Sequence, residues 1–293
     1  MRVGIITVGV DVTALAQRAE ALGFDCLWIP EHTTTPVQIA PKTTNYRQHL
    51  EEDGTPQLLY RSGQFADPFI TLARASAVTA RLKLGTGICL VPEHNPLLLA
   101  KQVATLDAFC GGRFRFGVGA GWLEEETAIM GGDFAHRWGQ TREAILAMKA
   151  LWTNESAAFH GKHYDFPAVL SYPKPAQQPH PPIYVGAFAM GNVFRRVVSY
   201  ADGWITWILT PEQVREGRAR LNEAARGAGR DPRSIDIVAM PVAAELDAFK
   251  AYEDAGADEA VVLVMPGPEP EMLNELEQIA RVVLPRYGAL TRA

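Results

Sequence analysis

The sequence lacks the features of a disulfide-stapled, membrane-spanning or nucleic-acid-binding protein. Its three cysteines, Cys26, Cys89 and Cys110, are odd in number and widely spaced, so we expect buried free thiols. No apolar run approaches the roughly 18 residues of a membrane span, and the chain opens on a strand-like segment without a secretory-signal pattern. The net charge of -5 gives no support for binding nucleic acid or an anionic membrane. A cytoplasmic protein is expected.

Several catalytic signatures are also missing. The chain has no H-x-H, H-E-x-x-H or C-x-x-C spacing, so no metal site is expected, and a metal-dependent barrel hydrolase is a remote reading. It has no G-x-S-x-G motif and therefore no evident serine nucleophile. The glycines of residues 117–121 follow G-x-G-x-G rather than the dinucleotide fingerprint G-x-G-x-x-G. This spacing argues against a nicotinamide dinucleotide as the cofactor. His160 and His163 lie in a predicted hairpin and are expected to be solvated.

Apolar runs alternating with helical patterns are the main positive feature. Residues 82–121 contain a strand, a helix that begins at a proline, and a second strand, which together predict a βαβ unit in a parallel sheet. Eight strands are predicted in all: Val3–Val8, Cys26–Pro30, Lys83–Val91, Arg113–Val118, Ile183–Gly186, Trp204–Leu209, Ile235–Met240 and Ala260–Met265. This count predicts an α/β fold, a (β/α)₈ TIM barrel in one domain over 1–293, with a doubly wound open sheet as the alternative.

Two segments interrupt this alternation. Residues 33–66 are polar and proline-bearing, without clear periodicity, and follow the second strand. Long loops in compact domains are commonly lids or binding loops, so we expect a lid-like insertion there. Residues 159–182 begin with FHGKHYDF, which predicts a short hairpin. Glycines finish the third and fourth strands, and the missing Cβ atoms would let backbone approach a flat ligand; they are Gly85 and Gly87, then Gly117, Gly119 and Gly121.

Several segments in a fixed order resemble one family. They are LGFDCLWIPEH (22–32), the stretch 67–122, and the later HGKHYDF, PPIYVGAF and ADGWIT. Together they cover most of residues 1–208 and resemble the bacterial luciferase-like superfamily of flavin and deazaflavin oxidoreductases. The LGTG strand and GRFRFGVGAGWLEEE are most similar to the branch that uses the deazaflavin coenzyme F420. The resemblance implies a TIM barrel with a tricyclic cofactor over the strand ends.

His32 is the candidate catalytic residue. It ends the second predicted strand, so it points into the mouth of a barrel, and its imidazole can exchange a proton near neutral pH. The resemblance places a matching histidine beside the deazaflavin ring. The neighbouring Glu31 faces the other way if the strand continues, and contacts the cofactor if the strand has ended.

The resemblance assigns further cofactor contacts. It implies a non-prolyl cis peptide at Gly87-Ile88 that supports the ring from behind, and ring contacts at Gly119, Gly121 and Trp122. Trp122 occupies the place of a catalytic glutamate in some relatives, which argues against a sugar-phosphate dehydrogenase of that kind.

Charged residues follow Trp122. The acids 124–126 suit the positive end of a helix dipole. Arg137 and Arg142 resemble a family pattern and are expected to pair with these acids.

A phosphate site is expected at residues 185–196, where a strand ends, a loop follows and a helix begins near Met190-Gly191-Asn192. Free amides at such a turn bind anions, and Arg195 and Arg196 lie close in sequence. The family uses this loop for the cofactor phosphate, so the cofactor-binding set gains three members: Gly186, Ala187 and Phe188.

The expected function is F420-dependent hydride transfer to or from a small organic substrate. The alternatives are an FMN-dependent monooxygenase with a separate flavin reductase, and a non-catalytic flavin-binding protein. The resemblance also implies a homodimer formed through helices beside the second and third strands.

Overall fold

The computed structural model describes residues 1–37, 65–189 and 191–288, and these form a closed barrel of parallel strands. The sheet runs in the order β3-β2-β1-β11-β10-β9-β8-β5-β4. The strands are β1 (Arg2–Ile6), β2 (Cys26–Ile29), β3 (Lys83–Thr86), β4 (Cys89–Leu90), β5 (Phe114–Gly119), β8 (Ile183–Gly186), β9 (Gly203–Trp207), β10 (Asp236–Met240) and β11 (Glu259–Leu263). A further pairing of β3 with β5 closes the sheet, which confirms the (β/α)₈ barrel and excludes the open alternative.

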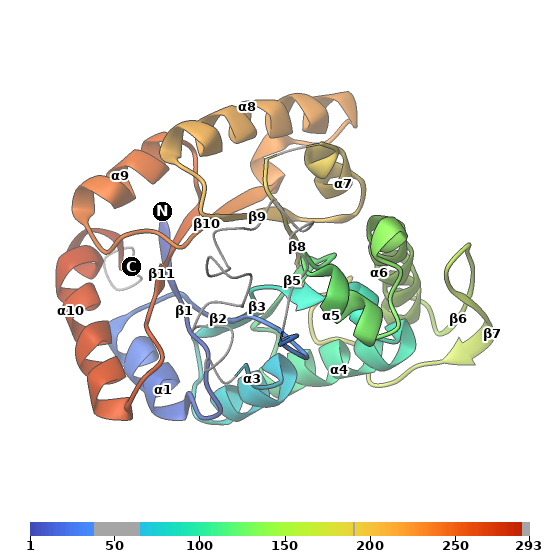
Figure 1. The fold of residues 1–293 in the computed structure, drawn as a ribbon, viewed down its shortest axis with the longest axis horizontal. Coiled ribbons are helices and arrows are strands. Elements are labelled where there is room, and N and C mark those ends of the chain that lie inside the picture. The colour runs from blue at the N-terminus through green and yellow to red at the C-terminus, as the bar shows by residue number, and fades with distance from the viewer. Residues whose placement is uncertain (38–64, 190, 289–293) are drawn as a thin grey trace.

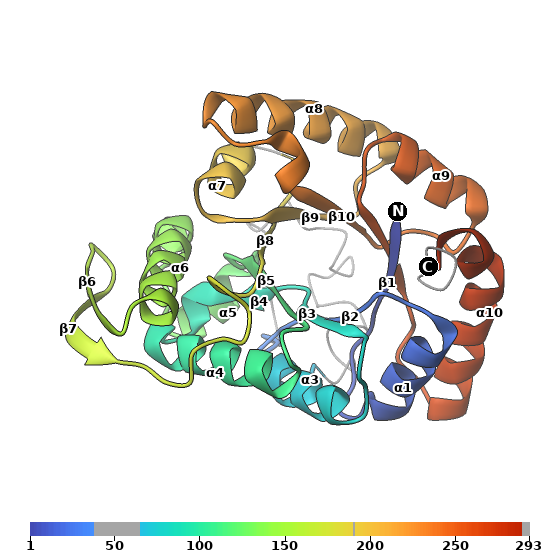
Figure 2. The ribbon, with the colours of Figure 1, turned by 180° about the vertical axis from the view of Figure 1, so that it is seen from behind.

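Helices form a ring around the strands (Figures 1 and 2). They are α1 (Thr13–Leu22), α3 (Pro68–Ala77), α4 (Pro96–Phe109), α5 (Glu124–Ile129), α6 (Arg137–Thr153), α7 (Val193–Tyr200), α8 (Pro211–Gly227), α9 (Leu246–Asp254) and α10 (Glu269–Tyr287). Local signals set several ends: Asn95 caps α4 before its first proline, and Thr210 and Gln213 form a capping box on α8. Every helix of the described residues is too short or too polar to span a bilayer.

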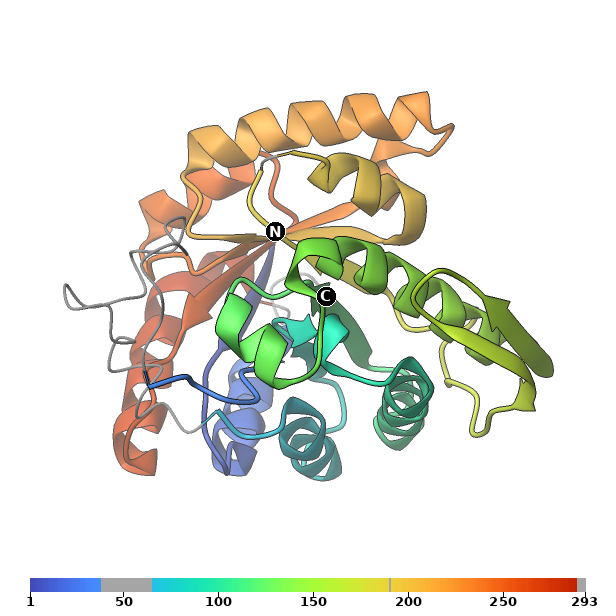
Figure 3. The same ribbon diagram turned by 45° about the vertical axis from the view of Figure 1, so that its right-hand side comes forward.

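The predicted hairpin is present outside the barrel. Strand β6 (Ser156–His160) pairs antiparallel with β7 (Asp165–Leu170), and the pair projects beside α6 (Figure 3). The His160 side chain is 72% exposed and lies 2.6 Å from Asp165, as expected for a solvated residue. All three cysteines are buried and free, which confirms the prediction of buried free thiols.

A buried ion pair fills the amino-terminal end of the barrel, which the apolar pattern did not predict. Arg115 of β5 pairs with Glu259 of β11, and Trp28 donates its indole N–H to Glu259 over 2.8 Å. The Arg115 guanidinium also lies 4.5 Å from the ring centre of Tyr184 and donates to the Tyr184 hydroxyl over 2.7 Å. These four polar side chains are therefore paired with one another.

The predicted lid falls mostly outside the described residues. Of 33–66, the structure describes residues 33–37 and 65–66, which flank the connection between β2 and α3.

Candidate functional site

A cavity of about 350 Å³ opens at the carboxyl ends of the strands, within the range of small-molecule sites. Its wall includes Thr7 after β1, Pro30 after β2 and Trp207 at the end of β9. The ten residues predicted to bind cofactor all line it: Glu31, His32, Gly87, Ile88, Gly119, Gly121, Trp122, Gly186, Ala187 and Phe188. The structure thus brings the predicted residues together, although their binding roles stay predictions.

Ile88 forms the floor of the cavity. The Gly87-Ile88 peptide bond is cis, as the resemblance implies, and it separates β3 from β4. A Cβ atom on Gly186 would lie 2.5 Å from Cγ2 of Ile88, and one on Gly119 would overlap Cδ1 of the same side chain. The two glycines therefore make room for Ile88, which presents an apolar surface to the cavity.

The glycines inside β3 and β5 have a different role from the predicted one. A Cβ on Gly85 would overlap the ring of Trp28, and a Cβ on Gly117 would overlap the carbonyl oxygen of Thr86. The space left by the missing Cβ atoms is filled by protein, so the prediction that these two glycines admit a flat ligand is wrong. They allow the strands and the barrel interior to pack.

His32 is held at the cavity edge by a carboxylate from α5. Its Nδ1 lies 2.7 Å from Oε2 of Glu126, whose other oxygen accepts the backbone N–H of Thr34 over 3.0 Å. The side chains of His32 and Glu126 are 9% and 1% exposed. The rings of Phe65 and Trp122 meet the imidazole edge-to-face at 5.0 and 5.9 Å. This packing and the hydrogen bond fix the ring orientation.

Sequence reasoning missed the part played by Glu126. The acids 124–126 do lie in the first turn of α5, as predicted, but Glu126 also turns inward. Its position three residues after buried Leu123 and next to buried Thr127 is the signal that could have shown this. Arg137, expected to pair with the acids, donates to the carbonyl of Gly121 over 3.2 Å and stacks on the ring of Phe134.

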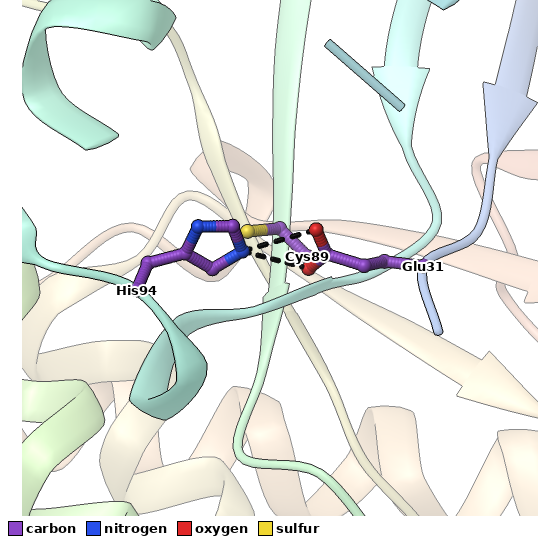
Figure 4. Close-up of side chains that lie close together, drawn as sticks. All are labelled: Glu31, Cys89 and His94. Carbon is purple, nitrogen blue, oxygen red and sulfur yellow. Dashed lines mark hydrogen bonds and ion pairs between the residues drawn. The ribbon is translucent and has the colours of Figure 1, made fainter. Parts of the chain in front are cut away.

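Glu31 lines the cavity but directs its carboxylate to a second histidine (Figure 4). Its oxygens lie 3.0 and 3.1 Å from Nε2 of His94, and Oε2 also accepts the backbone N–H of Leu90 over 2.6 Å. Burial lowers the pKa of His94, but the hydrogen bond and charge of Glu31 outweigh it and raise that pKa above its usual value. The result is an ion pair that braces β4.

Cys89 converges on the same ion pair, so the three side chains offer an oxygen, a sulfur and a nitrogen within 4.8 Å of one another. Burial, and then the charge of Glu31, raise the pKa of the Cys89 thiol well above its usual value. A metal ligand is a thiolate, and both Glu31 oxygens already accept hydrogen bonds. This donor set therefore fits a hydrogen-bonded brace better than a cation site.

The expected phosphate loop is only partly as predicted. Helix α7 begins at Val193, close to the expected start, but the Ala187 amide is not free because it donates to the carbonyl of Ile205 over 3.2 Å. Arg195 is exposed, whereas Arg196 lines the cavity and lies 4.2 Å from the ring centre of Trp138. Two positively charged side chains, Arg137 and Arg196, therefore line the cavity.

Together these features define a barrel enzyme site with an apolar floor, aromatic walls and a histidine–carboxylate pair at one edge. The model of the luciferase-like monooxygenase family matches residues 9–280, and the chain belongs to this family. Its members are oxidoreductases and monooxygenases.

Two relatives illustrate the range of proteins that are similar in sequence. An uncharacterised protein of Mycobacterium tuberculosis is 38% identical over 262 residues, 88% of each chain. An FMNH₂-dependent dimethylsulfone monooxygenase of Pseudomonas putida is 31% identical over 227 residues, which cover 74% of this chain and 59% of that enzyme.

Solved structures share the fold. Monooxygenase RslO1 of Streptomyces bottropensis superposes with a TM-score of 0.76 at 24% identity, over 98% of this chain and 100% of that one. The F420-dependent tetrahydromethanopterin reductase of Methanopyrus kandleri gives a TM-score of 0.73 at 17% identity, over 98% of this chain and 99% of that one. Similar proteins thus include both F420- and FMN-dependent enzymes.

Proposed function

We propose that this protein is an F420-dependent oxidoreductase that transfers a hydride to or from a small organic substrate. The observation that carries the proposal is the cavity whose floor is Ile88 and whose edge is the His32–Glu126 pair. A flat apolar floor suits a planar ring system, and a buried imidazole beside it can move the proton that accompanies a hydride transfer.

The residues of the cavity fit such a cofactor. Ile88 would support the ring, and Trp122 would pack at its side. The cofactor phosphate would lie toward Arg196, with the loop 186–188 as its neighbour. Bound there, the deazaflavin supplies two-electron hydride chemistry, whereas FMN would extend the chemistry to oxygen.

The lengths of similar proteins place this chain among compact single-barrel enzymes. The match to the F420-dependent reductase spans nearly all of both chains. The FMNH₂-dependent monooxygenase is much longer than the region it shares with this chain. The barrel has the size of the F420 enzyme and also of monooxygenase RslO1, so the choice of the deazaflavin is supported by the similarity of the LGTG and GRFRFGVGAGWLEEE segments to the F420 branch.

Equilibrium titration of the purified protein with F420 and with FMN tests the proposal. We expect an absorbance or fluorescence change that saturates with F420 at micromolar concentration, and binding of FMN at least tenfold weaker. Binding of FMN alone would favour the monooxygenase with a separate flavin reductase. Tight F420 binding without hydride transfer from any alcohol or to any unsaturated acceptor would favour a non-catalytic binding protein.

Replacing Gly119 by valine is expected to weaken cofactor binding by at least tenfold. The new side chain takes the space of the Ile88 side chain, which must move into the cavity. Gly227→Val is the matched control, because a Cβ there meets nothing within 4 Å. Unchanged affinity in Gly119→Val, measured by the same titration, would contradict the assigned floor.

We further propose that the protein forms a homodimer through α3 and α4. Three large apolar side chains on these helices are exposed, namely Ile70 (67%), Leu98 (58%) and Phe109 (69%). Sedimentation velocity should give the mass of two chains, and Phe109→Asp should shift the population toward monomer. If the wild-type protein sediments as a monomer at a concentration of roughly 50 μM, the proposal is refuted.

A further inference from the structure

Three buried carboxyl groups, one of them in the cavity wall, gather near His32 and His94. Glu126 faces His32, and Glu31 faces His94. The third, Glu93, is 8% exposed and ends the 3₁₀ turn Val91–Glu93 that follows β4. Within the described part of the chain, no donor meets either Glu93 oxygen in hydrogen-bond geometry, although the Thr33 hydroxyl lies near enough to favour its charged form. A buried carboxyl group without a firm partner calls for a function.

Glu93 lies directly behind the wall. A Cβ built on Gly121 would be 3.9 Å from Oε1 of Glu93, and Gly121 itself lines the cavity. The carboxyl group is therefore separated from the substrate space by one backbone segment, on the side where α5 supplies Glu126.

The surroundings keep Glu93 protonated at neutral pH. Burial raises its pKa to about 8, and the negative charges of Glu126 and Glu31 act in the same direction. Thr33 and His94 lower the pKa by less. A neutral Glu93 leaves Glu126 as the carboxylate that faces the imidazole.

We infer that Glu126 and Glu93 are positioning residues that act on the substrate proton through His32. Glu126 orients the imidazole and stabilises its cation, and Glu93 controls how much negative charge surrounds this pair. The inference rests on the proposed function. When a substrate hydroxyl is deprotonated, its O–H bond breaks, an N–H bond forms at Nε2 of His32, and the resulting imidazolium lies against the Glu126 carboxylate. Ionised Glu93 would add a second negative charge near this pair, so that the proton His32 has accepted from the substrate leaves the site more slowly.

Glu126→Gln tests whether Glu126 positions His32. We expect kcat with F420 and substrate to fall about 10²-fold, the size of a general-base contribution, while KM changes less than threefold. Glu126→Asp, which keeps the charge, should recover part of the loss. Glu124→Gln is the matched control, because Glu124 is an exposed acid on the same helix turn. Full activity of Glu126→Gln in an enzyme that turns over would overturn the role of Glu126.

Glu93→Gln tests whether Glu93 sets the negative charge around the His32–Glu126 pair, through two pH titrations. In wild type and Glu124→Gln, the infrared carbonyl band of a protonated buried carboxyl should disappear with a midpoint near pH 8 in protein without cofactor. The band should be missing in Glu93→Gln, and in Glu126→Gln its midpoint should fall because a like charge is gone. The kcat of wild type should fall as the pH rises through about 8, where Glu93 becomes charged, and Glu93→Gln should lack this decrease.

The two titrations separate the possible failures. The infrared measurement needs no cofactor, so an intact carboxyl titration in a protein without F420 activity would count against the proposed function alone. A band that persists in Glu93→Gln, or a pH limb that survives this substitution in the active enzyme, would overturn the inference.

Discussion

Replacing His32 by alanine is expected to lower kcat for hydride transfer by about 10²–10⁴-fold, the range that general acid–base catalysis supplies. The imidazole is the titratable group at the cavity edge that packing and a 2.7 Å hydrogen bond to Glu126 hold in a fixed orientation. Alanine removes the proton carrier and leaves the Ile88 floor untouched. The affinity for F420 should therefore change less than tenfold. Steady-state kinetics and the cofactor titration measure the two effects separately.

His160→Ala is the control for this experiment. That imidazole is 72% exposed on the hairpin outside the barrel, so its loss should leave both quantities unchanged. Wild-type turnover in His32→Ala would show that another group moves the proton. Loss of cofactor affinity as large as the loss of kcat would instead assign His32 to binding.

Replacing Glu259 by alanine is expected to destabilise the fold by about 3–5 kcal/mol, because it leaves the charge of Arg115 buried without its main partner. Asp236, 3.6 Å from Arg115, compensates only in part, and Trp28 loses the acceptor of its indole N–H. For a domain of this size the melting temperature should fall by roughly 10 °C. Thermal denaturation followed by circular dichroism measures the change.

Asp254→Ala is the matched control, since Asp254 pairs with Lys250 on an exposed face of α9. Such a surface pair contributes at most about 1 kcal/mol, so the melting temperature should hardly move. Equal stability of wild type and Glu259→Ala would mean that the barrel interior does not depend on this ion pair.

The parts of the fold that follow from local pattern could be read from the sequence. Apolar runs of four to six residues became buried strands because both faces of a parallel sheet are covered. Chain order then placed the ends of β2, β5 and β8 at one mouth, so His32 could be assigned to the cavity there, and the family resemblance added residues such as Phe188. The family resemblance supplied the cis bond at Gly87-Ile88, which no propensity indicates.

Contacts between distant charged residues were beyond the sequence pattern. Glu126 lies 94 positions from His32, and Glu259 lies 144 positions from Arg115. An acid on a short helix has the same local sequence whether it faces water or the barrel. Which face turns inward depends on how α5 sits across the barrel mouth.

The sequence by itself determined the alternation of strands and helices and the barrel class, because hydrophobic periodicity and chain order act locally, and the family resemblance supplied most of the residues expected at its open end. Only the tertiary structure decided that Gly119 and Gly186 make room for Ile88, that Glu126 holds His32 and that Glu93 is buried near them. These are consequences of packing density and of charges brought together in a low-dielectric interior, and neither quantity exists until the chain is folded.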